Sequence, residues 1–260
     1  MKNIGLFITC LADLFRPTVA LAAVKLIEQN GDKVHVPAQT CCGQPAYNSG
    51  DKANSVDIAK ANIEKFERFD YVVAPSGSCA AMIAKHYPEM LKDDPAWSRR
   101  ARDLARRTFE LTSYLTDVVG MTEVDAHYDG TITYHDSCSG LREMNVSQQP
   151  RQLLNSVDGL SISEMHGSDL CCGFGGTFCV KYGEISNEIV GRKVKSIKDS
   201  GADTLVAGDL GCLMNMAGRL KRDGSNVKVR HVAEILADMC DETPPIAETD
   251  MDGASAGQAR

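Results

Sequence analysis

Eight of the ten cysteines in this sequence fall into two sets with nearly the same spacing. Each set has a single cysteine, then a Cys-Cys-Gly triplet after 30 or 32 further residues, then another single cysteine. The first set is Cys10, Cys41, Cys42 and Cys79, and the second is Cys138, Cys171, Cys172 and Cys212. Corresponding cysteines are offset by 128 to 133 residues, which indicates one thiol-bearing module that has been duplicated.

Four thiolates gathered at one place can hold a [4Fe–4S] cluster or a zinc ion. Structural zinc sites usually bring their cysteines as C-x₂₋₄-C pairs, whereas the close cysteines here are directly adjacent in sequence. The spacing therefore favours iron–sulfur clusters, with all eight cysteines as ligands and one site in each module. A zinc site, or buried thiols that pack as small apolar groups, are the alternatives.

Glycines follow both cysteine pairs, and the second pair is followed by a glycine-rich run. We expect Gly43, Gly173, Gly175 and Gly176 to let the backbone approach a cluster closely and donate amide hydrogens to its sulfides. A dinucleotide-binding G-x-G-x-x-G motif is excluded, because Phe178 stands where the third glycine would be needed. No side chain is assigned a catalytic role.

The remaining cysteines and the histidines give weaker signals. Cys179 corresponds to Ser49 in the first module, so it is not expected to be a shared ligand, and Cys240 is interpreted as incidental. His135 lies three residues before Cys138. It is either a structural histidine, which is the commoner case, or a residue beside the metal ligands.

Short apolar runs precede the cysteines and predict strands, whereas longer amphipathic stretches between them predict helices. The expected strands are residues 4–9, 34–36, 70–75, 131–134, 160–163, 203–207 and 227–232. The expected helices are residues 17–30, 51–69, 185–200 and 233–239, and residues 80–120 are expected to be mostly helical.

Strands that alternate with helices imply parallel sheets with right-handed crossovers. The sequence thus predicts an α/β fold of two similar Rossmann-like modules with parallel sheets, residues 1–120 and 121–240, related by internal duplication. In such sheets ligands bind at the carboxyl ends of the strands, where the single cysteines of both sets are expected. The acidic residues 241–260 contain too little apolar surface to fold alone and are predicted to be a disordered tail.

Composition excludes several functional classes. A formal net charge of −7 argues against a nucleic-acid or anionic-membrane surface, and no apolar run approaches the length of a membrane span. The apolar run that ends at Cys10 is too short for a signal peptide. We therefore expect a cytosolic protein, whose thiols stay reduced rather than forming disulfides.

Five segments resemble the Cys-Cys-Gly iron–sulfur proteins of the heterodisulfide reductase B-subunit type, and most closely their lactate utilization protein A branch. These segments are FITC (7–10), CCGQPAYNSG (41–50), PSGSC (75–79), CCGFGGTF (171–178) and GCLMN (211–215). The resemblance extends over residues 1–240.

The resemblance implies an iron–sulfur electron-transfer subunit of a cytosolic complex that oxidises L-lactate to pyruvate. Its partners would be a second iron–sulfur protein and a smaller subunit, and its cofactors two [4Fe–4S] clusters near the module interface. Related branches imply two alternatives, a thiol–disulfide reductase subunit of heterodisulfide reductase type and a subunit of a glycolate- or glycerol-3-phosphate-oxidising complex.

The sequence departs from the family at one position in each module. The fuller motif ends in Cys-x-x-Cys and supports a non-cubane cluster in some members, but Ser76 and Asp209 stand where its first cysteine would be. Four thiolates per module suffice for a cubane cluster, so a non-cubane cluster is not expected unless Ser76 or Asp209 adds an oxygen ligand.

Overall fold

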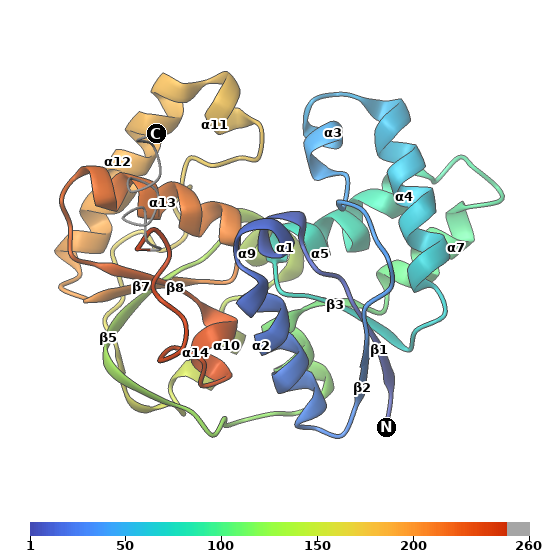
Figure 1. The fold of residues 1–260 in the computed structure, drawn as a ribbon. Coiled ribbons are helices and arrows are strands. Elements are labelled where there is room, and N and C mark those ends of the chain that lie inside the picture. Colours follow the sequence, from blue (N-terminus) through green and yellow to red (C-terminus); the bar gives the residue numbers. More distant parts are fainter. Residues whose placement is uncertain (249–260) are drawn as a thin grey trace, which may run out of the picture.

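Two four-stranded parallel sheets, one in each half of the chain, form the framework of the protein (Figure 1). The computed structural model describes residues 1–248. The first sheet contains β1 (Asn3–Leu6), β2 (Lys33–His35), β3 (Tyr71–Ala74) and β4 (Thr108–Glu110). The second contains β5 (His127–His135), β6 (Asp158–Ile162), β7 (Thr204–Ala207) and β8 (Lys228–His231).

The two sheets have equivalent topologies. The strand order is β2-β1-β3-β4 in the first and β6-β5-β7-β8 in the second, and every neighbouring pair is parallel. The central strands β3 and β7 are apolar and almost wholly buried, as expected for parallel strands covered on both faces. The predicted fold of two similar α/β modules is therefore confirmed.

Helices connect the strands and flank both sheets. In the first half they are α1 (Cys10–Phe15), α2 (Pro17–Glu28), α3 (Gln44–Asn48), α4 (Lys52–Phe66), α5 (Gly77–Ala81), the π-helical η1 (Met82–His86), α6 (Tyr87–Met90), α7 (Ser98–Ala105), α8 (Leu111–Ser113) and the π-helical η2 (Tyr114–Val118). In the second half they are α9 (Cys138–Met144), α10 (Gln148–Leu154), α11 (Phe178–Lys181), α12 (Gly183–Asp199), α13 (Leu210–Arg222) and α14 (Val232–Leu236).

The structure refines two local predictions. Residues 80–120 are mostly helical, as expected, but they also contain β4, which has only three residues and pairs with β3. So short a strand shows no alternation that distinguishes it from a helix. The first predicted strand, 4–9, ends at Leu6, because Thr9 caps α1 by accepting a hydrogen bond from the amide of Ala12.

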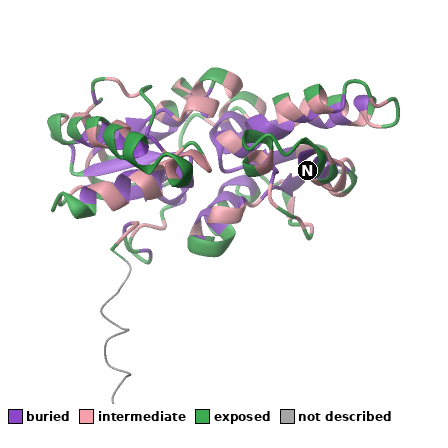
Figure 2. Ribbon diagram, turned by 90° about the horizontal axis from the view of Figure 1, so that it is seen from above, coloured by how far each residue is buried: buried purple, intermediate pink, exposed green. Residues whose placement is uncertain are grey.

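One hydrophobic core extends across both modules. It joins Ile4 and Leu6 of β1 to Ile132 of β5, and it includes residues of α2 and α14, which pack against each other. Figure 2 shows the strands buried and the outer helix faces exposed. Because the modules share apolar surface, they form one packed unit rather than two independent bodies.

Polar and close backbone contacts also join the modules. Arg16 Nε lies 2.7 Å from Glu234 Oε1, with 7% and 0% of the two side chains exposed. At the centre of Figure 1, α5 and α9 approach so closely that a Cβ on Gly77 would lie 2.6 Å from the Cα of Gly140. Only glycine fits such an approach, which draws the helices of the two cysteine sets together.

The last described residues lie against the second sheet. The amide of Ile246 donates a hydrogen bond to the carbonyl of Val229 at 2.9 Å, and Thr243 is 5% exposed. Residues 241–248, which the sequence placed in the tail, thus contact β8. The remainder of the predicted tail, 249–260, lies outside the described residues.

Candidate metal centre

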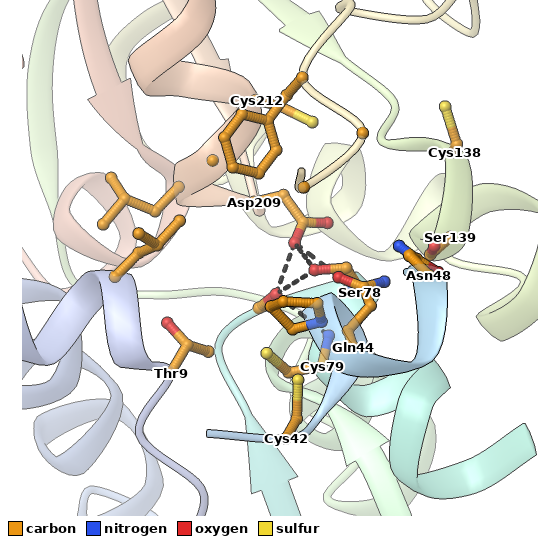
Figure 3. Close-up of a pocket in the computed structure, with 18 of the residues that line it drawn as sticks. Thr9, Cys42, Gln44, Asn48, Ser78, Cys79, Cys138, Ser139, Asp209 and Cys212 are labelled. Atoms are coloured by element: carbon orange, nitrogen blue, oxygen red, sulfur yellow. Dashed lines mark hydrogen bonds between the residues drawn. The ribbon is translucent and has the colours of Figure 1, made fainter. Parts of the chain in front are cut away.

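All eight cysteines of the two sets line a single cavity of about 530 Å³. Figure 3 shows side chains from both modules converging on it, with Cys42 and Cys79 on one side and Cys138 and Cys212 on the other. The cavity is formed where the carboxyl ends of β1, β3, β5 and β7 give way to helices. The two spaced sets found in the sequence are therefore neighbours in the fold.

Each single cysteine lies in the first turn of the helix that follows a strand. Cys10 and Cys138 are the first residues of α1 and α9, after the caps Thr9 and Ser137. Cys79 and Cys212 are the third residues of α5 and α13. These equivalent positions explain the equivalent spacing, and they direct the thiols toward the same edge of each sheet.

The cysteine pairs are shaped by the glycine that follows each of them. Gly43 and Gly173 have φ values of +86° and +81°, in the left-handed region that favours glycine. Their amides donate hydrogen bonds to Cys41 Sγ at 3.5 Å and Cys171 Sγ at 3.3 Å. Each amide thus donates to the first cysteine of its own pair, and a thiolate accepts such bonds well.

The other two predicted glycines belong to the cavity wall. Gly175 and Gly176 line the cavity and have φ values of +52° and +65°. A Cβ on Gly175 would lie 2.8 Å from the Cβ of Phe178. Their conformation lets the loop turn in front of the second cysteine pair.

The thiols within each set interact strongly. Cys10 Sγ lies 3.8 Å from Cys41 Sγ, and the hydrogen bond from Cys10 lowers the pKa of Cys41 to about 2. In the second module the hydrogen bond from Cys138 lowers the pKa of Cys171 to about 2. The same contact raises the pKa of the donor thiol in each pair. Each set therefore contains one thiol whose pKa is lowered beside thiols whose pKa is raised, and the thiolate form is the one that binds metals.

Side-chain amides and a tyrosine fix the backbone of the cysteine pairs. Asn62 Nδ2 donates to the carbonyl of Cys41 at 3.1 Å, and Tyr87 donates its hydroxyl to the carbonyl of Cys42 at 2.7 Å. In the second module Asn215 Nδ2 donates to the carbonyl of Cys172 at 2.8 Å. These contacts hold the pairs from behind and leave the sulfur atoms facing the cavity.

The two positions that lack a cysteine face each other across the module interface. Ser76 Oγ donates to Asp209 Oδ1 at 2.5 Å, and Ser78 donates its hydroxyl to the same oxygen at 2.7 Å. Asp209 Oδ2 is buried and has no hydrogen-bond partner within residues 1–248. Ser76 and Asp209 therefore contact each other across the interface between the two modules.

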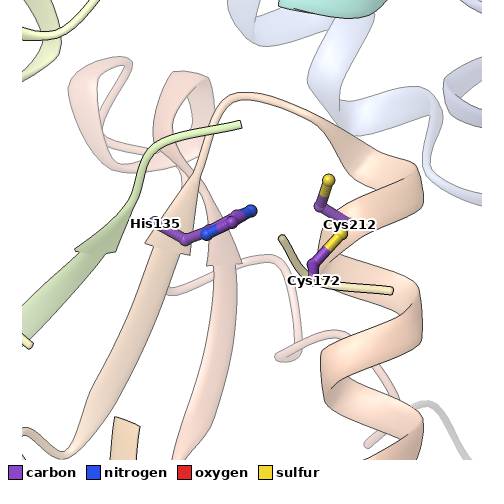
Figure 4. Close-up of side chains that lie close together, drawn as sticks. All are labelled: His135, Cys172 and Cys212. Atoms are coloured by element: carbon purple, nitrogen blue, oxygen red, sulfur yellow. The ribbon is translucent and has the colours of Figure 1, made fainter. Parts of the chain in front are cut away.

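The second site differs from the first by two buried basic residues. His135 is fully buried at the end of β5, beside the thiols of Cys172 and Cys212 (Figure 4). Burial, together with the nearby charge of Lys193, lowers its pKa to about 3. Burial lowers the pKa of Lys193 to about 8, while its amino group donates to the carbonyls of Gly167 and Ser168 at 2.7 and 2.9 Å.

Sequence reasoning left the role of His135 open and did not single out Lys193. The only sequence signal for His135 was its position three residues before Cys138. Of the remaining cysteines, Cys179 donates its thiol to the carbonyl of Gly176 at 3.3 Å and does not line the cavity. Burial raises the pKa of the Cys240 thiol to about 11, and this cysteine packs against the shared core instead.

The donor set fits iron–sulfur clusters. Four thiols from one module meet at one edge of its sheet, at least one of them favours the thiolate form, and a glycine amide already donates a hydrogen bond to sulfur. Clusters of this type need thiolate ligands, and such N–H···S bonds tune their reduction potentials.

Among the helices of residues 1–248, none has the length and apolar composition that a membrane span requires.

Comparison with known proteins gives a consistent result. The family profile of a cysteine-rich domain, designated CCG, matches residues 4–84 and 132–217. A lactate utilization protein A from Halalkalibacterium halodurans is 47% identical over 235 residues, which cover 90% of this chain and 96% of that protein. One from Macrococcus caseolyticus is 49% identical over the same shares of the two chains.

Among solved structures, a hypothetical protein from Helicobacter pylori has a similar fold, with a TM-score of 0.62 and 15% sequence identity. The similarity covers 92% of this chain but 49% of the other, so the chain spans about half the length of that protein. At this level of identity the likeness concerns the fold alone.

Proposed function

The chain belongs to the cysteine-rich CCG-domain family and, within it, to the lactate utilization protein A proteins, and from that premise we propose that it is an iron–sulfur electron-transfer subunit of a cytosolic complex that oxidises L-lactate to pyruvate. The observation that carries this proposal is the gathering of eight thiols, from equivalent positions of two modules, around one cavity. When bound, iron–sulfur clusters supply one-electron redox chemistry.

Each module would hold one cluster. The ligands would be Cys10, Cys41, Cys42 and Cys79 in the first, and Cys138, Cys171, Cys172 and Cys212 in the second. Gly43 and Gly173 would donate their amide hydrogens to the ligand sulfurs, while Gly175 and Gly176 would form the wall in front of the second site. Asn62, Tyr87 and Asn215 would keep the ligand backbone in place. Since all eight thiols line one cavity, electrons could pass between the two sites without crossing the protein core.

The oxidation of a 2-hydroxy acid removes two electrons together as a hydride equivalent, and enzymes normally use a flavin or a nicotinamide for that step. The sequence has no fingerprint for either cofactor. We therefore propose that the chain receives electrons from partner subunits, a second iron–sulfur protein and a smaller subunit, rather than from lactate directly.

The test begins with the full chain purified without oxygen. It should contain about eight iron atoms and as many sulfides per chain, the sum of two [4Fe–4S] clusters. Lactate should not reduce the clusters of the isolated chain but should reduce them after the partner subunits are added. Stoichiometric zinc without sulfide would contradict the iron–sulfur assignment. Rapid reduction of the isolated chain by lactate would contradict the proposal that its electrons come from partner subunits.

The size of the cavity favours a second candidate, a thiol–disulfide reductase subunit of heterodisulfide reductase type. A volume of about 530 Å³ lies within the range of small-molecule sites, and both cysteine sets open into it. The reduced chain would then transfer electrons to an organic disulfide in the cavity. Oxidation of the dithionite-reduced clusters by a small disulfide such as cystamine, at a rate that exceeds the rate with buffer alone, would favour this candidate over a subunit that only relays electrons.

A further inference from the structure

His135 has a buried ring nitrogen that faces the thiols of the second site. Its Nδ1 atom lies 3.2 Å from the carbonyl oxygen of Ser168. Its Nε2 atom has no hydrogen-bond partner among the residues that the structure describes. One ring nitrogen of His135 and the Sγ atoms of Cys172 and Cys212 all lie within 4.8 Å of one another (Figure 4).

The contact with Ser168 determines which ring nitrogen carries the proton. A carbonyl oxygen can only accept a hydrogen bond, so Nδ1 must be the donor. In a neutral imidazole the other nitrogen then has a free lone pair, and here that nitrogen is the unpartnered Nε2. Histidines that bind metals almost always donate the opposite ring N–H to a carbonyl or carboxylate in this way.

A buried acceptor without a partner normally costs free energy. The burial of His135 is complete, so water cannot readily satisfy Nε2. A metal ion held by Cys172 and Cys212 would provide the missing interaction. The environment of His135 is thus that of a ligand whose metal partner is the same one that the thiols bind.

Asp209 is the obvious competitor, because it stands where the fuller motif has a fifth cysteine. Its Oδ1 atom accepts hydrogen bonds from Ser76 and Ser78 across the module interface, whereas its Oδ2 atom, like His135 Nε2, is buried without a partner in residues 1–248. Within the described residues, the only compact group of possible ligand atoms is that of His135, Cys172 and Cys212, and Asp209 is not part of it. The histidine is therefore better placed than the carboxylate to add a donor to the thiols.

The first module has no counterpart to this donor. Phe7 precedes Cys10 by three residues, as His135 precedes Cys138, and it is fully buried in the core beside Cys42 and Cys79. Counting from the cysteine pairs, Ile63 stands where the second module has Lys193. The second site thus contains a nitrogen donor and a buried amine, and the first contains apolar groups in their places.

We propose that His135 is a ligand of the metal centre in the second module, so that the chain combines one thiolate-only site with one mixed histidine–cysteine site. This inference rests on the proposed function, since it takes the second site to bind iron. The imidazole of His135 adds no negative charge to the second site, and the ammonium group of Lys193 nearby favours the more negative, reduced state of a cluster, whose reduction potential depends on the net charge around it. The second site should therefore be reduced before the first.

The internal duplication provides a matched experiment. The full chain, labelled with ¹⁵N-histidine and purified without oxygen, is examined by pulsed EPR after partial reduction. Two backgrounds are compared, Cys41→Ala, which retains an intact second site, and Cys171→Ala, which retains an intact first site. A histidine nitrogen coupling as strong as that of directly coordinated imidazole is expected in the Cys41→Ala chain and absent from the Cys171→Ala chain.

The outcomes separate this inference from the proposed function. In one outcome both variants contain iron while the Cys41→Ala chain shows no histidine nitrogen coupling, or only the weak coupling of a hydrogen-bonded neighbour. That result would overturn the role of His135 as a ligand and leave the iron–sulfur assignment intact. A chain without iron would overturn the proposed function and this inference together. Because the labelled experiment leaves His135 unchanged, it does not depend on whether variants at this position fold.

Two histidine variants give a second measurement. His135→Phe makes the second site resemble the first, whereas His86→Phe removes a histidine that lines the same cavity from the first module. His135→Phe should abolish the nitrogen coupling and shift the distribution of one electron between the sites toward the first by at least tenfold, about 59 mV. His86→Phe should change neither. An unchanged distribution in His135→Phe, or the same loss of coupling in both variants, would contradict the proposal.

Discussion

Ser76 and Asp209 occupy equivalent positions in the two modules, and they are hydrogen-bonded to each other. Ser76 Oγ lies 2.5 Å from Asp209 Oδ1, and each residue stands three positions before the last cysteine of its set. The sequence raised the question of whether either residue binds iron. Their mutual contact assigns them a role that needs no metal, because it joins α5 to α13 beside the cavity.

The first prediction concerns this contact. Replacing Asp209 by alanine removes the carboxylate that accepts hydrogen bonds from the hydroxyls of Ser76 and Ser78, and it should lower the free energy of unfolding by about 1–3 kcal/mol. Iron content should stay unchanged if neither residue is a ligand. Chemical denaturation and iron analysis of Asp209→Ala measure both quantities, with Ser139→Ala, at another cavity-lining serine, as the control. Loss of about half of the iron in Asp209→Ala would instead identify Asp209 as a ligand.

The second prediction tests whether the two cysteine sets bind metal independently. Cys41→Ala and Cys171→Ala should each remove about half of the iron, because each variant destroys one of two clusters. Cys179→Ser and Cys240→Ser should retain all of it, since neither thiol lines the cavity. Iron and sulfide analysis of protein purified without oxygen decides the matter. If Cys179→Ser loses as much iron as Cys171→Ala, the ligand set of the second module is wrong.

The third prediction concerns the buried ion pair that connects the modules. Arg16→Met leaves the carboxylate of Glu234 buried without its cation, which should cost about 3–5 kcal/mol of stability. Thr18 Oγ1, 2.6 Å from Glu234 Oε1, cannot neutralise that charge. The exposed pair of Arg192 and Glu188 provides the control, because its loss in Arg192→Ala should cost less than about 1 kcal/mol. Equal effects of the two substitutions on denaturation midpoints would show that the interface does not depend on this pair.

The fourth prediction is a pH dependence of stability. Glu110 is fully buried, and burial raises its pKa from 4.5 to about 7. A raised pKa means that the folded state holds the proton more tightly than the unfolded state. The contribution of Glu110 to stability is therefore complete below pH 4.5 and is lost as the pH rises to about 7, by roughly 3 kcal/mol.

Glu110→Gln should remove this component, because glutamine can still accept a hydrogen bond from Thr112 but does not ionise. Denaturation of both proteins at several pH values between 4 and 8, in the same metal state, compares their slopes. Identical slopes would mean that Glu110 does not titrate in this range.

Much of the fold follows from local sequence patterns. The apolar runs at 70–75 and 203–207 predict strands, because buried parallel strands need continuous apolar residues, and the structure has β3 (Tyr71–Ala74) and β7 (Thr204–Ala207) there. The duplication, the parallel topology and the placement of the single cysteines after strands were read from the same patterns. Strand β4 was missed, since three residues in a mostly helical region give no periodic signal.

The sequence by itself determined which side chains could bind metal, because thiol type and repeated spacing are properties of the chain. Only the tertiary structure decided that both sets face one cavity, that Ser76 pairs with Asp209, and that a ring nitrogen of His135 lies beside the thiols of Cys172 and Cys212. These relationships depend on how the two modules pack and on which backbone carbonyl meets each side chain. Residues separated by more than a hundred positions come together because the two modules bury a shared apolar core. The local spacing of residues in the sequence does not predict such long-range contacts.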